Sequence, residues 1–456
     1  MKKITSVLLL SFILPILQIF CSCADNRPID RYFLQISYQN GVVEGSLSYS
    51  FEVESDDNVL FNLYPNQMNN GSLLTIKRVC LNEGECDFEV IENGAYLVID
   101  LFGKVKAGDG ASLTIDFVTE IASSYSRLGK NDLTVNLAYF YPVACVYNGG
   151  YVKQPYSAFG DCFYNDFCDM EVELTIPSIM SVACGFQPLE IAVMGEKTTY
   201  RYEMNQTKSF TCTLSDVYNI VSKREGGAHV NYFYYNDNSP EERLQEIIDC
   251  LDFLSGKIGE YPYSVLTVAQ SPYESAGMEY SGFCVIGECE REDDYNYAII
   301  HEVCHQYFPI CFLLNEYESG YLDEGLTEFL AQSYLESKKS GVKRAHAQYC
   351  ESLISAYARA QSTLGKSYDG VMKKALNSFL SKDEYIVTAY YKGYLLFCLI
   401  EKQCGDIFPY LKKAFNNYAF KKLAEDELAS CFGVHQKAVK KIFDENVLNG
   451  RIITLD

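Results

Sequence analysis

Apolar and polar positions alternate through most of the first half of the chain, with the two-residue period of β-strands. Residues 31–53 hold two such runs joined through Gln39-Asn40-Gly41, a combination typical of a β-hairpin. Further runs follow up to residue 219 with turn residues between them, and no long helical pattern interrupts them. They are SLLTIKRVCL, AYLVIDLF, ASLTIDFVTEI, MEVELTIP and YRYEMNQTKSFTCTL. The pattern predicts an antiparallel β-sandwich or saddle.

The pattern changes at Ser239, where a helix start is predicted. Ser239 can cap the helix, Pro240 suits its first position, and Glu241 and Glu242 place acids in its first turn, before RLQEIIDCLDFLSGKI. One or two strands, SVLTVAQ and GFCVIGE, come next, and helical patterns fill most of the remainder. The KREGG sequence near residues 221–231 resembles a linker. We therefore expect a multidomain α+β chain, with a β domain over residues 25–222 and a mostly helical domain over residues 223–456.

The first 24 residues have the order of a secretory signal peptide. Lys2 and Lys3 supply positive charge, residues 4–20 are apolar, and small residues precede the expected cleavage after Ala24. Cys23 offers an alternative, because a lipid-modified cysteine there would make a lipoprotein. No later run reaches the roughly eighteen uncharged apolar residues that span a bilayer. We expect an exported protein, either secreted or attached to the outer face of the membrane through this segment alone.

Two of the five histidines, His301 and His305, lie in the sequence His-Glu-Val-Cys-His. In a helix, two residues four apart lie on one face, so both imidazoles would point to one place. Eighteen residues separate His305 from Glu324, which can bring a carboxylate there. Two nitrogens and one oxygen leave a fourth position for water, as in catalytic zinc sites, and Glu302 can then take a proton from that water. We predict one zinc ion here; the alternative is a chance HExxH of ordinary helix residues.

Composition narrows the range of partners. Asp and Glu total 60 against 38 Lys and Arg, for a net charge of -22, so we expect no nucleic-acid partner bound through its phosphates. Nearly half of the 456 residues are apolar, which is enough for the cores of two or three domains. The chain has 37 Tyr and no Trp, so tyrosine is expected to take interior aromatic positions.

Cysteine is plentiful, with eighteen in the chain. Cys80 with Cys86, and Cys162 with Cys168, are local pairs that could form disulfides after export. Others lie in apolar helical runs, where a free cysteine behaves as a small hydrophobic residue. Cys304 stands between the two motif histidines, and we expect it to point away from the metal and pack inside the protein.

Two further stretches carry candidate chemistry. Glu279 in AGMEYSG precedes a predicted strand, where it would either line a cleft beside the His-Glu-Val-Cys-His helix or be solvated at a strand edge. Tyr390 and Tyr391 in TAYYKG begin an apolar helix. A tyrosine hydroxyl there would either donate to the oxyanion of amide hydrolysis or simply pack. The residues alone leave both choices open.

Taken in order, AGMEYSG, HEVCH, LDEGLTEFL and YYKG resemble the zinc aminopeptidase family of the gluzincin clan, which includes alanyl aminopeptidase and leukotriene hydrolase. The segment YPVACVYNGGYVKQPYSAFGDCFYNDFCDMEVELTIP is similar to the end of the N-terminal domain in bacterial members. The resemblance covers nearly the whole chain after the signal segment, and its four separated elements make it specific. It implies a thermolysin-like catalytic domain and a short bacterial-type enzyme that removes N-terminal residues from peptides.

The resemblance assigns roles by position. Glu279 takes the place of the glutamate that holds the free α-amine of the substrate. Tyr390 takes that of the oxyanion tyrosine, with Tyr391 as the alternative if the register shifts by one. Gly277 and Met278 match backbone positions along the bound peptide. The other assignments agree with those made from spacing: His301, His305 and Glu324 as zinc ligands, and Glu302 as general base.

Departures from the family pattern leave several points open. Tyr280 stands where the family usually has Asn, which puts the shape of the first subsite in question. The second amine-binding residue, usually from the β domain, cannot be assigned. The chain ends about sixty residues after Tyr390, so the large C-terminal helical domain of many members is not expected. Asp323 and Glu328 either orient the ligands or are solvated helix acids, and the composition favours solvation.

Two other functions are compatible with these residues. The first is a zinc peptidase that does not require a free amine, because Tyr280 has rebuilt the subsite. The second is an exported binding protein that keeps zinc without catalysis. Cleavage of N-acetylated substrates separates the first from an aminopeptidase, and intact catalytic positions argue against the second.

Overall fold

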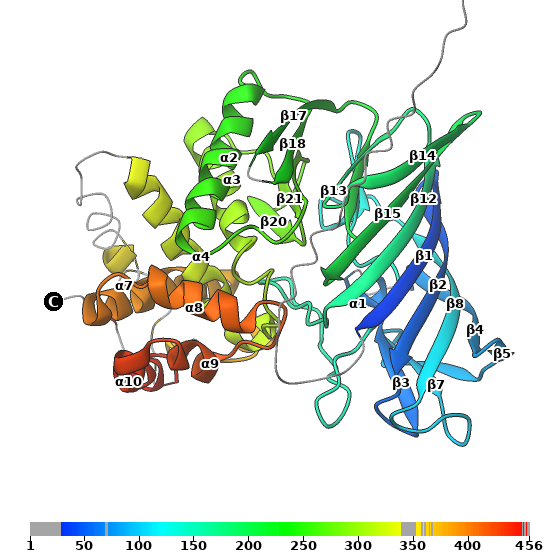
Figure 1. The fold of residues 1–456 in the computed structure, drawn as a ribbon, viewed down its shortest axis with the longest axis horizontal. Coiled ribbons are helices and arrows are strands. Elements are labelled where there is room, and N and C mark those ends of the chain that lie inside the picture. The colour runs from blue at the N-terminus through cyan, green and yellow to red at the C-terminus, as the bar shows by residue number, and fades with distance from the viewer. Residues whose placement is uncertain are drawn as a thin grey trace, which may run out of the picture.

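A computed structural model describes residues 29–448, apart from residues 69–71, 226, 339–352, 357, 358, 360, 361, 364, 366 and 367, together with residues 450 and 453. The predicted signal peptide, residues 1–24, lies outside the described residues. Figure 1 shows two parts, with β-sheets built from the N-terminal half and helices around a smaller sheet in the C-terminal half. The predicted α+β fold, a β domain followed by a mostly helical domain, is confirmed.

The N-terminal part is organised by an eight-stranded sheet with strand order β14-β15-β12-β1-β2-β8-β4-β5. The predicted hairpin joins β1 and β2 through Asn40 and Gly41, which both have the positive φ of such a turn. The sheet departs from a purely antiparallel one because β1 pairs with β12 in parallel. Its strands are β1 (Asp30–Gln39), β2 (Val42–Glu52), β4 (Leu74–Leu81), β5 (Gly84–Glu85), β8 (Gly110–Glu120), β12 (Cys168–Pro177), β14 (Pro188–Met194) and β15 (Lys197–Thr207).

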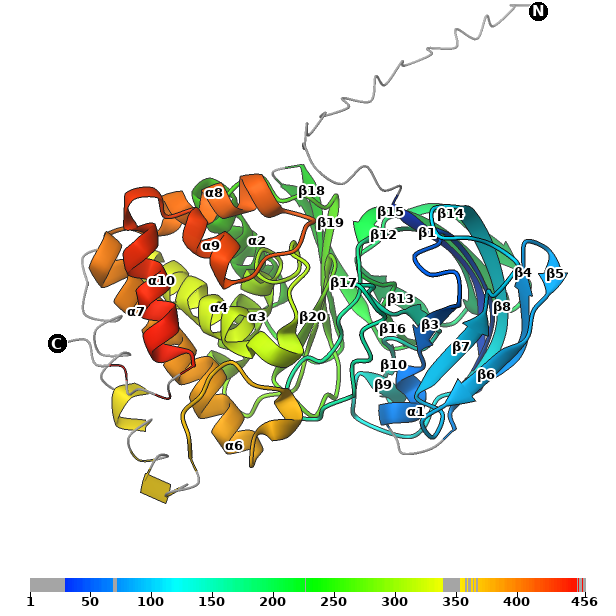
Figure 2. The same ribbon diagram turned by 90° about the horizontal axis from the view of Figure 1, so that it is seen from below.

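Two four-stranded sheets, β13-β16-β10-β9 and β11-β3-β7-β6, lie on the concave side of the large sheet (Figure 2). Alternate residues of the large sheet, such as Leu34, Leu113 and Val172, are fully buried against them, as the two-residue period requires. The smaller elements are β3 (Asn58–Asn62), α1 (Tyr64–Met68), β6 (Phe88–Ile91), β7 (Tyr96–Asp100), β9 (Leu128–Lys130), β10 (Val135–Leu137), β11 (Val143–Ala144), β13 (Ser181–Cys184) and β16 (Cys212–Ser215).

The C-terminal part has a five-stranded sheet, β17-β18-β19-β21-β20, covered by helices. Helix α2 begins at Pro240 with Ser239 at the N-cap position, as predicted, although the serine side chain makes no capping hydrogen bond. The elements are β17 (Asn219–Glu225), β18 (Ala228–Tyr234), α2 (Pro240–Lys257), β19 (Val265–Gln270), β20 (Gly277–Tyr280), β21 (Phe283–Ile286), α3 (Glu292–His305), α4 (Glu316–Lys338), η2 (Leu376–Ser378), α6 (Lys382–Tyr385), the π-helix η3 (Ile386–Lys392), α7 (Gly393–Cys404), α8 (Phe408–Tyr418), α9 (Glu425–Ser430), η4 (Gly433–His435) and α10 (Gln436–Asn446).

The segment predicted as a linker, residues 221–231, is instead the β17–β18 hairpin, and the linker interpretation is wrong. The predicted division between residues 222 and 223 falls inside β17, which pairs within the C-terminal sheet. Charged Lys223 and Arg224 lie on an exposed edge strand, and Gly227 follows at the turn with a positive φ. A charged edge strand and its glycine turn have the same composition as a flexible linker, so composition alone could not separate them.

The cysteines in the described part of the chain are all free thiols. The two local pairs, Cys80 with Cys86 and Cys162 with Cys168, therefore do not form disulfides there. Cys304 points away from its neighbouring histidines, as predicted, with its Sγ 3.9 Å from the buried Sγ of Cys250 on α2. Within the described residues, no helix has both the length and the apolar character that crossing a bilayer requires.

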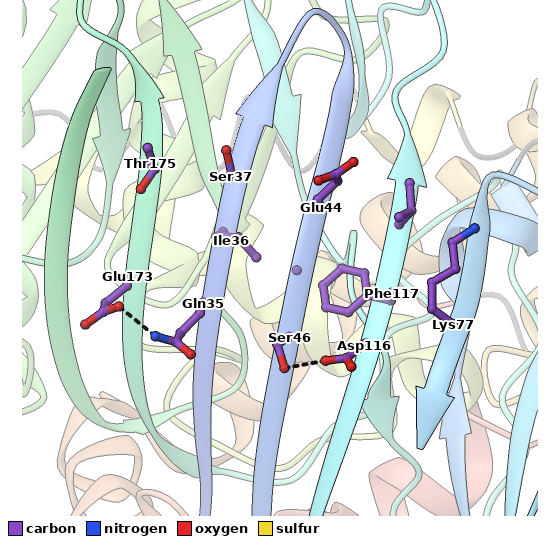
Figure 3. A pocket seen from close by; sticks show the side chains of 12 residues that line it. Gln35, Ile36, Ser37, Glu44, Ser46, Lys77, Asp116, Phe117, Glu173 and Thr175 are labelled. Atoms are coloured by element: carbon purple, nitrogen blue, oxygen red, sulfur yellow. Dashed lines mark hydrogen bonds between the residues drawn. The ribbon is translucent and has the colours of Figure 1, made fainter. Parts of the chain in front are cut away.

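A hollow of about 500 Å³ lies on the solvent-facing side of the large sheet (Figure 3). Its polar side chains bond to each other: Gln35 Nε2 donates to Glu173 at 2.8 Å, and Ser46 Oγ donates to Asp116 at 2.7 Å. The hollow shares no residue with the histidine motif and belongs entirely to the N-terminal part.

Candidate active site

His301, His305 and Glu324 are brought together by the packing of α3 against α4. The two histidine Nε2 atoms are 3.0 Å apart, and Glu324 Oε2 lies 3.2 Å from the first and 3.4 Å from the second. All three side chains are buried. Three ligand atoms from two helices therefore converge on one point, in the arrangement that the spacing predicts.

The electrostatics of this cluster favour a cation. Burial would lower the pKa of His301, but hydrogen bonds to the Glu324 and Glu328 carboxylates outweigh it and raise the pKa to about 10. Burial would raise the pKa of Glu324, but the two imidazoles lower it to about 2. The carboxylates thus hold positive charge in the cluster, and a divalent metal ion can replace the protons that the histidines otherwise carry.

The partners of His305 set which ring nitrogen faces the cluster. Its Nδ1 lies 3.0 Å from Thr327 Oγ1 and 3.1 Å from Asp323 Oδ1. Because Thr327 Oγ1 donates its own hydrogen to the Phe308 carbonyl at 2.8 Å, it accepts from Nδ1. The proton is therefore held on Nδ1, and the lone pair of Nε2 points to the cluster, as metal binding requires.

His301 is oriented in the same way by a carboxylate. Its Nδ1 is 3.3 Å from Glu328 Oε1, and the other oxygen of Glu328 accepts from the Tyr297 hydroxyl at 2.5 Å. Gln332 in turn donates to the Tyr297 oxygen at 3.1 Å. This carboxylate faces the outer nitrogen of His301 and leaves its Nε2 facing the cluster.

Asp323 and Glu328 correct an expectation from the sequence, which favoured solvated helix acids. Asp323 is fully buried and Glu328 is 6% exposed, and each contacts one histidine of the motif. Glu328 lies on the inner side of α4 because it is one turn from Glu324. Asp323 is buried against His305 from a neighbouring direction around the helix. Two nitrogen ligands and one carboxylate, with both outer nitrogens held in this way, fit zinc. Neither group of metal-ligating atoms in the described chain includes a cysteine.

Glu302 lies beside the ligands on α3 and is buried. Burial, opposed by the charges of His305 and His301, raises the pKa of its carboxyl group to about 7. One carboxylate oxygen has no hydrogen-bond partner among the described residues. The other packs on Gly277, where a Cβ would lie only 2.4 Å from it. A carboxyl group with this pKa can accept and release a proton near neutral pH.

Glu279 projects from β20 beside α3 and is buried, with its Oε1 3.7 Å from His305 Nδ1. Burial raises the pKa of Glu279 well above its ordinary value, and the charge of Asp161 raises it further. Gly277 and Met278 precede it on the same strand, at the edge of the sheet. The sequence-predicted residues of β20 thus lie next to the histidine cluster.

Asp161, from the N-terminal part, was missed by the sequence interpretation. It forms an ion pair with Arg127 in which both side chains are partly exposed, and its charge acts on the pKa values of both Glu279 and Glu302. It lies in the segment AFGDCFYNDF, which the family resemblance includes. Its position beside the site depends on how the two parts of the chain pack, so no local spacing identifies it.

Tyr390 lies on the π-helix η3 and donates a hydrogen bond to Glu324 Oε1 at 2.5 Å. Its ring stacks on that of His301, with centroids 5.9 Å apart. The alternative, Tyr391, packs instead on the Tyr368 and Val387 cluster. The structure therefore places Tyr390 at the metal site and Tyr391 outside it.

Tyr385, one turn before Tyr390, is a second tyrosine that the sequence did not indicate. Its ring is perpendicular to that of Tyr390 at 5.9 Å, and its buried hydroxyl has no hydrogen-bond partner among the described residues. A Cβ at Gly160 or Gly320 would lie 2.4 or 3.0 Å from this hydroxyl. The two glycines therefore make room for the tyrosine where the two parts of the chain meet.

Solved structures with a similar fold include M1 zinc metallopeptidases. The M1 zinc metallopeptidase from Deinococcus radiodurans matches with a TM-score of 0.68 and 14% identity, over 94% of each chain. Two further structures match equally well. One is a glutamate-to-alanine mutant of a two-domain M1 zinc metallopeptidase bound to L-arginine. The other is a mutant of the Deinococcus radiodurans protein bound to a Tyr-Ser-Ala substrate. Each has a TM-score of 0.68 and 13% identity, over 94% of this chain and 95% of the other. Comparison with curated proteins gave no match.

The fold and the His-His-Glu cluster define a zinc metallopeptidase. The family model for the peptidase family M1 domain matches residues 244–446, which include α3, α4 and η3. Residues 244–446 thus match an M1 peptidase domain, which agrees with the aminopeptidase resemblance found in the sequence.

Proposed function

We propose that this chain is an aminopeptidase that removes N-terminal residues from peptides, with a single zinc ion held by His301, His305 and Glu324. The observation that carries the proposal is the position of Glu279. Glu279 is a buried carboxyl group beside the metal-binding cluster. Burial disfavours its ionised form, and the substrate's α-ammonium group would restore that form by pairing with it. A peptide held there by its first residue would present its first amide bond to the metal.

The roles of the chain's own side chains follow from their positions. When bound, zinc acidifies a water molecule and polarises the scissile carbonyl. Glu302, with its pKa near 7, takes a proton from this water and passes it to the departing amine. Tyr390 moves its hydrogen bond from Glu324 to the carbonyl oxygen as negative charge develops there. Gly277 keeps the Glu302 carboxylate in place, and Met278 lies along the peptide.

Asp161 supports the same recognition from the N-terminal domain. It is the acid of that domain whose charge reaches Glu279, but its ion pair with Arg127 offsets that charge. Glu279 therefore carries the main interaction with the ammonium group, and Asp161 strengthens the negative potential around it. Related metallopeptidase structures that hold L-arginine and Tyr-Ser-Ala support a substrate with a free amino terminus.

The test compares an alanyl anilide with its N-acetylated form, using the wild-type chain and Glu279→Gln. We expect only the free-amine substrate to be cleaved efficiently. We also expect Glu279→Gln to raise KM for this substrate more than it lowers kcat, because the ammonium contact is lost. Equal cleavage of both substrates by the wild-type chain would instead identify a peptidase that does not require a free amine. Absence of hydrolysis in the zinc-loaded chain would favour the binding protein.

We further propose that the protein is exported, with residues 1–24 acting as the signal peptide. The support is the charged, apolar and small-residue order of this segment. Mass spectrometry of the protein from its own cells tests this directly. An amino terminus at Asp25 indicates secretion, a lipid-modified Cys23 indicates a lipoprotein, and an intact Met1 contradicts export.

A further inference from the structure

Strand β14 forms one edge of the large sheet (Figure 1). It exposes a run of apolar side chains. The turn between β12 and β13 adds one more, because Ser178 N donates to the Glu196 carbonyl and holds that turn against the tip of the β14–β15 hairpin. Each of these side chains is 55–80% exposed. We call them the β14 patch, which consists of Ile179, Leu189, Ile191, Val193 and Met194.

The inner face of the large sheet continues onto β14 without a cover. Ile191 pairs with Tyr200, and Val193 pairs with Thr198. Cross-strand partners share a face, and Thr198 is only 5% exposed because it lies in the core. Ile191 and Val193 on the same face are 55% and 66% exposed. The apolar surface of the core therefore extends one strand beyond the part that this chain covers.

The outer edge of β14 is also available for pairing. In the described part of the chain, no backbone hydrogen bond joins residues 188–194 to any segment other than β15. Edge strands are commonly protected by shortness or by charge. Among the described edge strands only β14 and β17 have seven residues, and β17 carries Lys223, Arg224 and Glu225. β14 has the sequence PLEIAVM, with one charge. Its proline and an irregularity in the pairing lie at residues 188–190, so Ile191 to Met194 are left without this protection.

We infer that β14 is a dimerisation edge that pairs antiparallel with β14 of a second copy of this chain. A two-fold axis through Ala192 would set Ile191 opposite Val193 of the second copy and Glu190 opposite Met194. An axis through Ile191 would set Leu189 opposite Val193. In both registers apolar residues meet on one face and the two glutamates never face each other, so the strand is complementary to itself.

The size of the patch agrees with a dimer. The exposed fractions of its five residues correspond to roughly 600 Å² of mostly apolar surface, beyond what single scattered side chains present. This is below the roughly 800 Å² per partner of a standard protein interface, so the dimer would be a modest one. Because the strands would continue one sheet, the edge backbone groups would also find partners. A second copy would pair the edge backbone groups and bring the exposed Ile191 and Val193 side chains of the two copies into lateral contact.

The test is the oligomeric state of the full-length, zinc-loaded chain by analytical ultracentrifugation from 1 to 100 µM, a range around the roughly micromolar affinity of a modest interface. The variant is Ile191→Lys with Val193→Lys, which puts positive charges opposite each other in the dimer. The control is Leu380→Lys with Val434→Lys, at exposed apolar positions outside the patch. Every variant keeps the apolar N-terminal run, so only differences between variants report on β14.

We expect a dimer for the wild type and the control, and a dissociation constant at least tenfold higher for the β14 variant, with peptidase activity unchanged in all three. If the β14 variant fails to fold by thermal melting, the single substitution Ile191→Lys replaces it, because position 191 faces Val193 in one register and itself in the other. A wild-type chain that is monomeric throughout, or a dimer that survives both β14 variants, would overturn the inference. So would a monomer that binds phosphatidylcholine vesicles through Ile191 and Val193, since the patch would then contact lipid.

Discussion

The contact between Gly325 and Gly393 offers a sharp perturbation of the site. Gly325 follows the ligand Glu324 on α4, and Gly393 begins α7 just after the helix that carries Tyr390. A Cβ on Gly325 would lie 2.5 Å from Gly393 Cα and 2.6 Å from its carbonyl carbon. Both atoms are backbone, so Gly325→Ala cannot be accommodated by turning a side chain.

The expected size of the effect follows from this geometry. Restoring an ordinary carbon–carbon contact of about 3.6 Å requires α4 and α7 to separate by about 1 Å. Overpacking of this kind costs about 1–3 kcal/mol of folding free energy. The same movement would lengthen the 2.5 Å bond from Tyr390 to Glu324 to about 3.5 Å, beyond hydrogen-bonding range. A displacement of about 1 Å can lower turnover by about 100-fold.

The assay measures kcat, KM and melting temperature with an aminoacyl anilide. The matched control is Gly256→Ala near the end of α2, where an added Cβ has nothing within 4 Å. Because alanine favours a helix more than glycine, the control should be neutral or stabilised by up to about 1 kcal/mol. The reasoning would be refuted if Gly325→Ala matched Gly256→Ala in both melting temperature and turnover.

Three other changes test separate parts of the account. Glu302→Gln keeps the shape of the side chain but removes the proton acceptor, so kcat should fall by a factor of about 10²–10⁴. The zinc content, measured by mass spectrometry, should stay constant. An unchanged kcat would contradict the role of Glu302 as base. Gly277→Ala places a Cβ 2.4 Å from Glu302 Oε1 and should lower kcat with little change in melting temperature; wild-type kinetics would show that the carboxylate has room to move. Lys392 is fully buried, and burial lowers its pKa to about 8. Above this pH the unfolded chain therefore binds more protons than the folded chain does, and the free energy of unfolding rises with pH. Between about pH 7.5 and 9.5, the rise for the wild type should exceed that for Lys392→Met by about 2 kcal/mol. Parallel pH curves from denaturant titrations would contradict the burial of that charge.

Local patterns predicted the elements that depend on neighbours in sequence. Asn40-Gly41 fixes a hairpin through its positive φ values, and Pro240 fixes a helix start. The four-residue spacing of His301 and His305 places both on one face of α3. In each case the determining geometry spans a few residues, so sequence alone carries it.

Other features depend on packing between distant segments. Asp323 and Glu328 look like solvated acids because their helix is rich in charge, yet α3 covers them and their charges face imidazoles. Asp161 approaches Glu279 only because the N-terminal sheets pack against the catalytic domain. The seven-residue edge strand β17, with Lys223, has the composition of a linker, and the strand pairing that distinguishes the two is not local.

The central claim is that two imidazoles and one carboxylate from α3 and α4 hold a single zinc ion. X-ray absorption at the zinc edge, combined with metal analysis of the purified chain, measures this most directly. The account predicts one zinc per chain with nitrogen and oxygen neighbours only, two of them imidazole nitrogens at about 2.0–2.1 Å. A sulfur neighbour at about 2.3 Å, or zinc retained at full stoichiometry after His301→Ala, would contradict it.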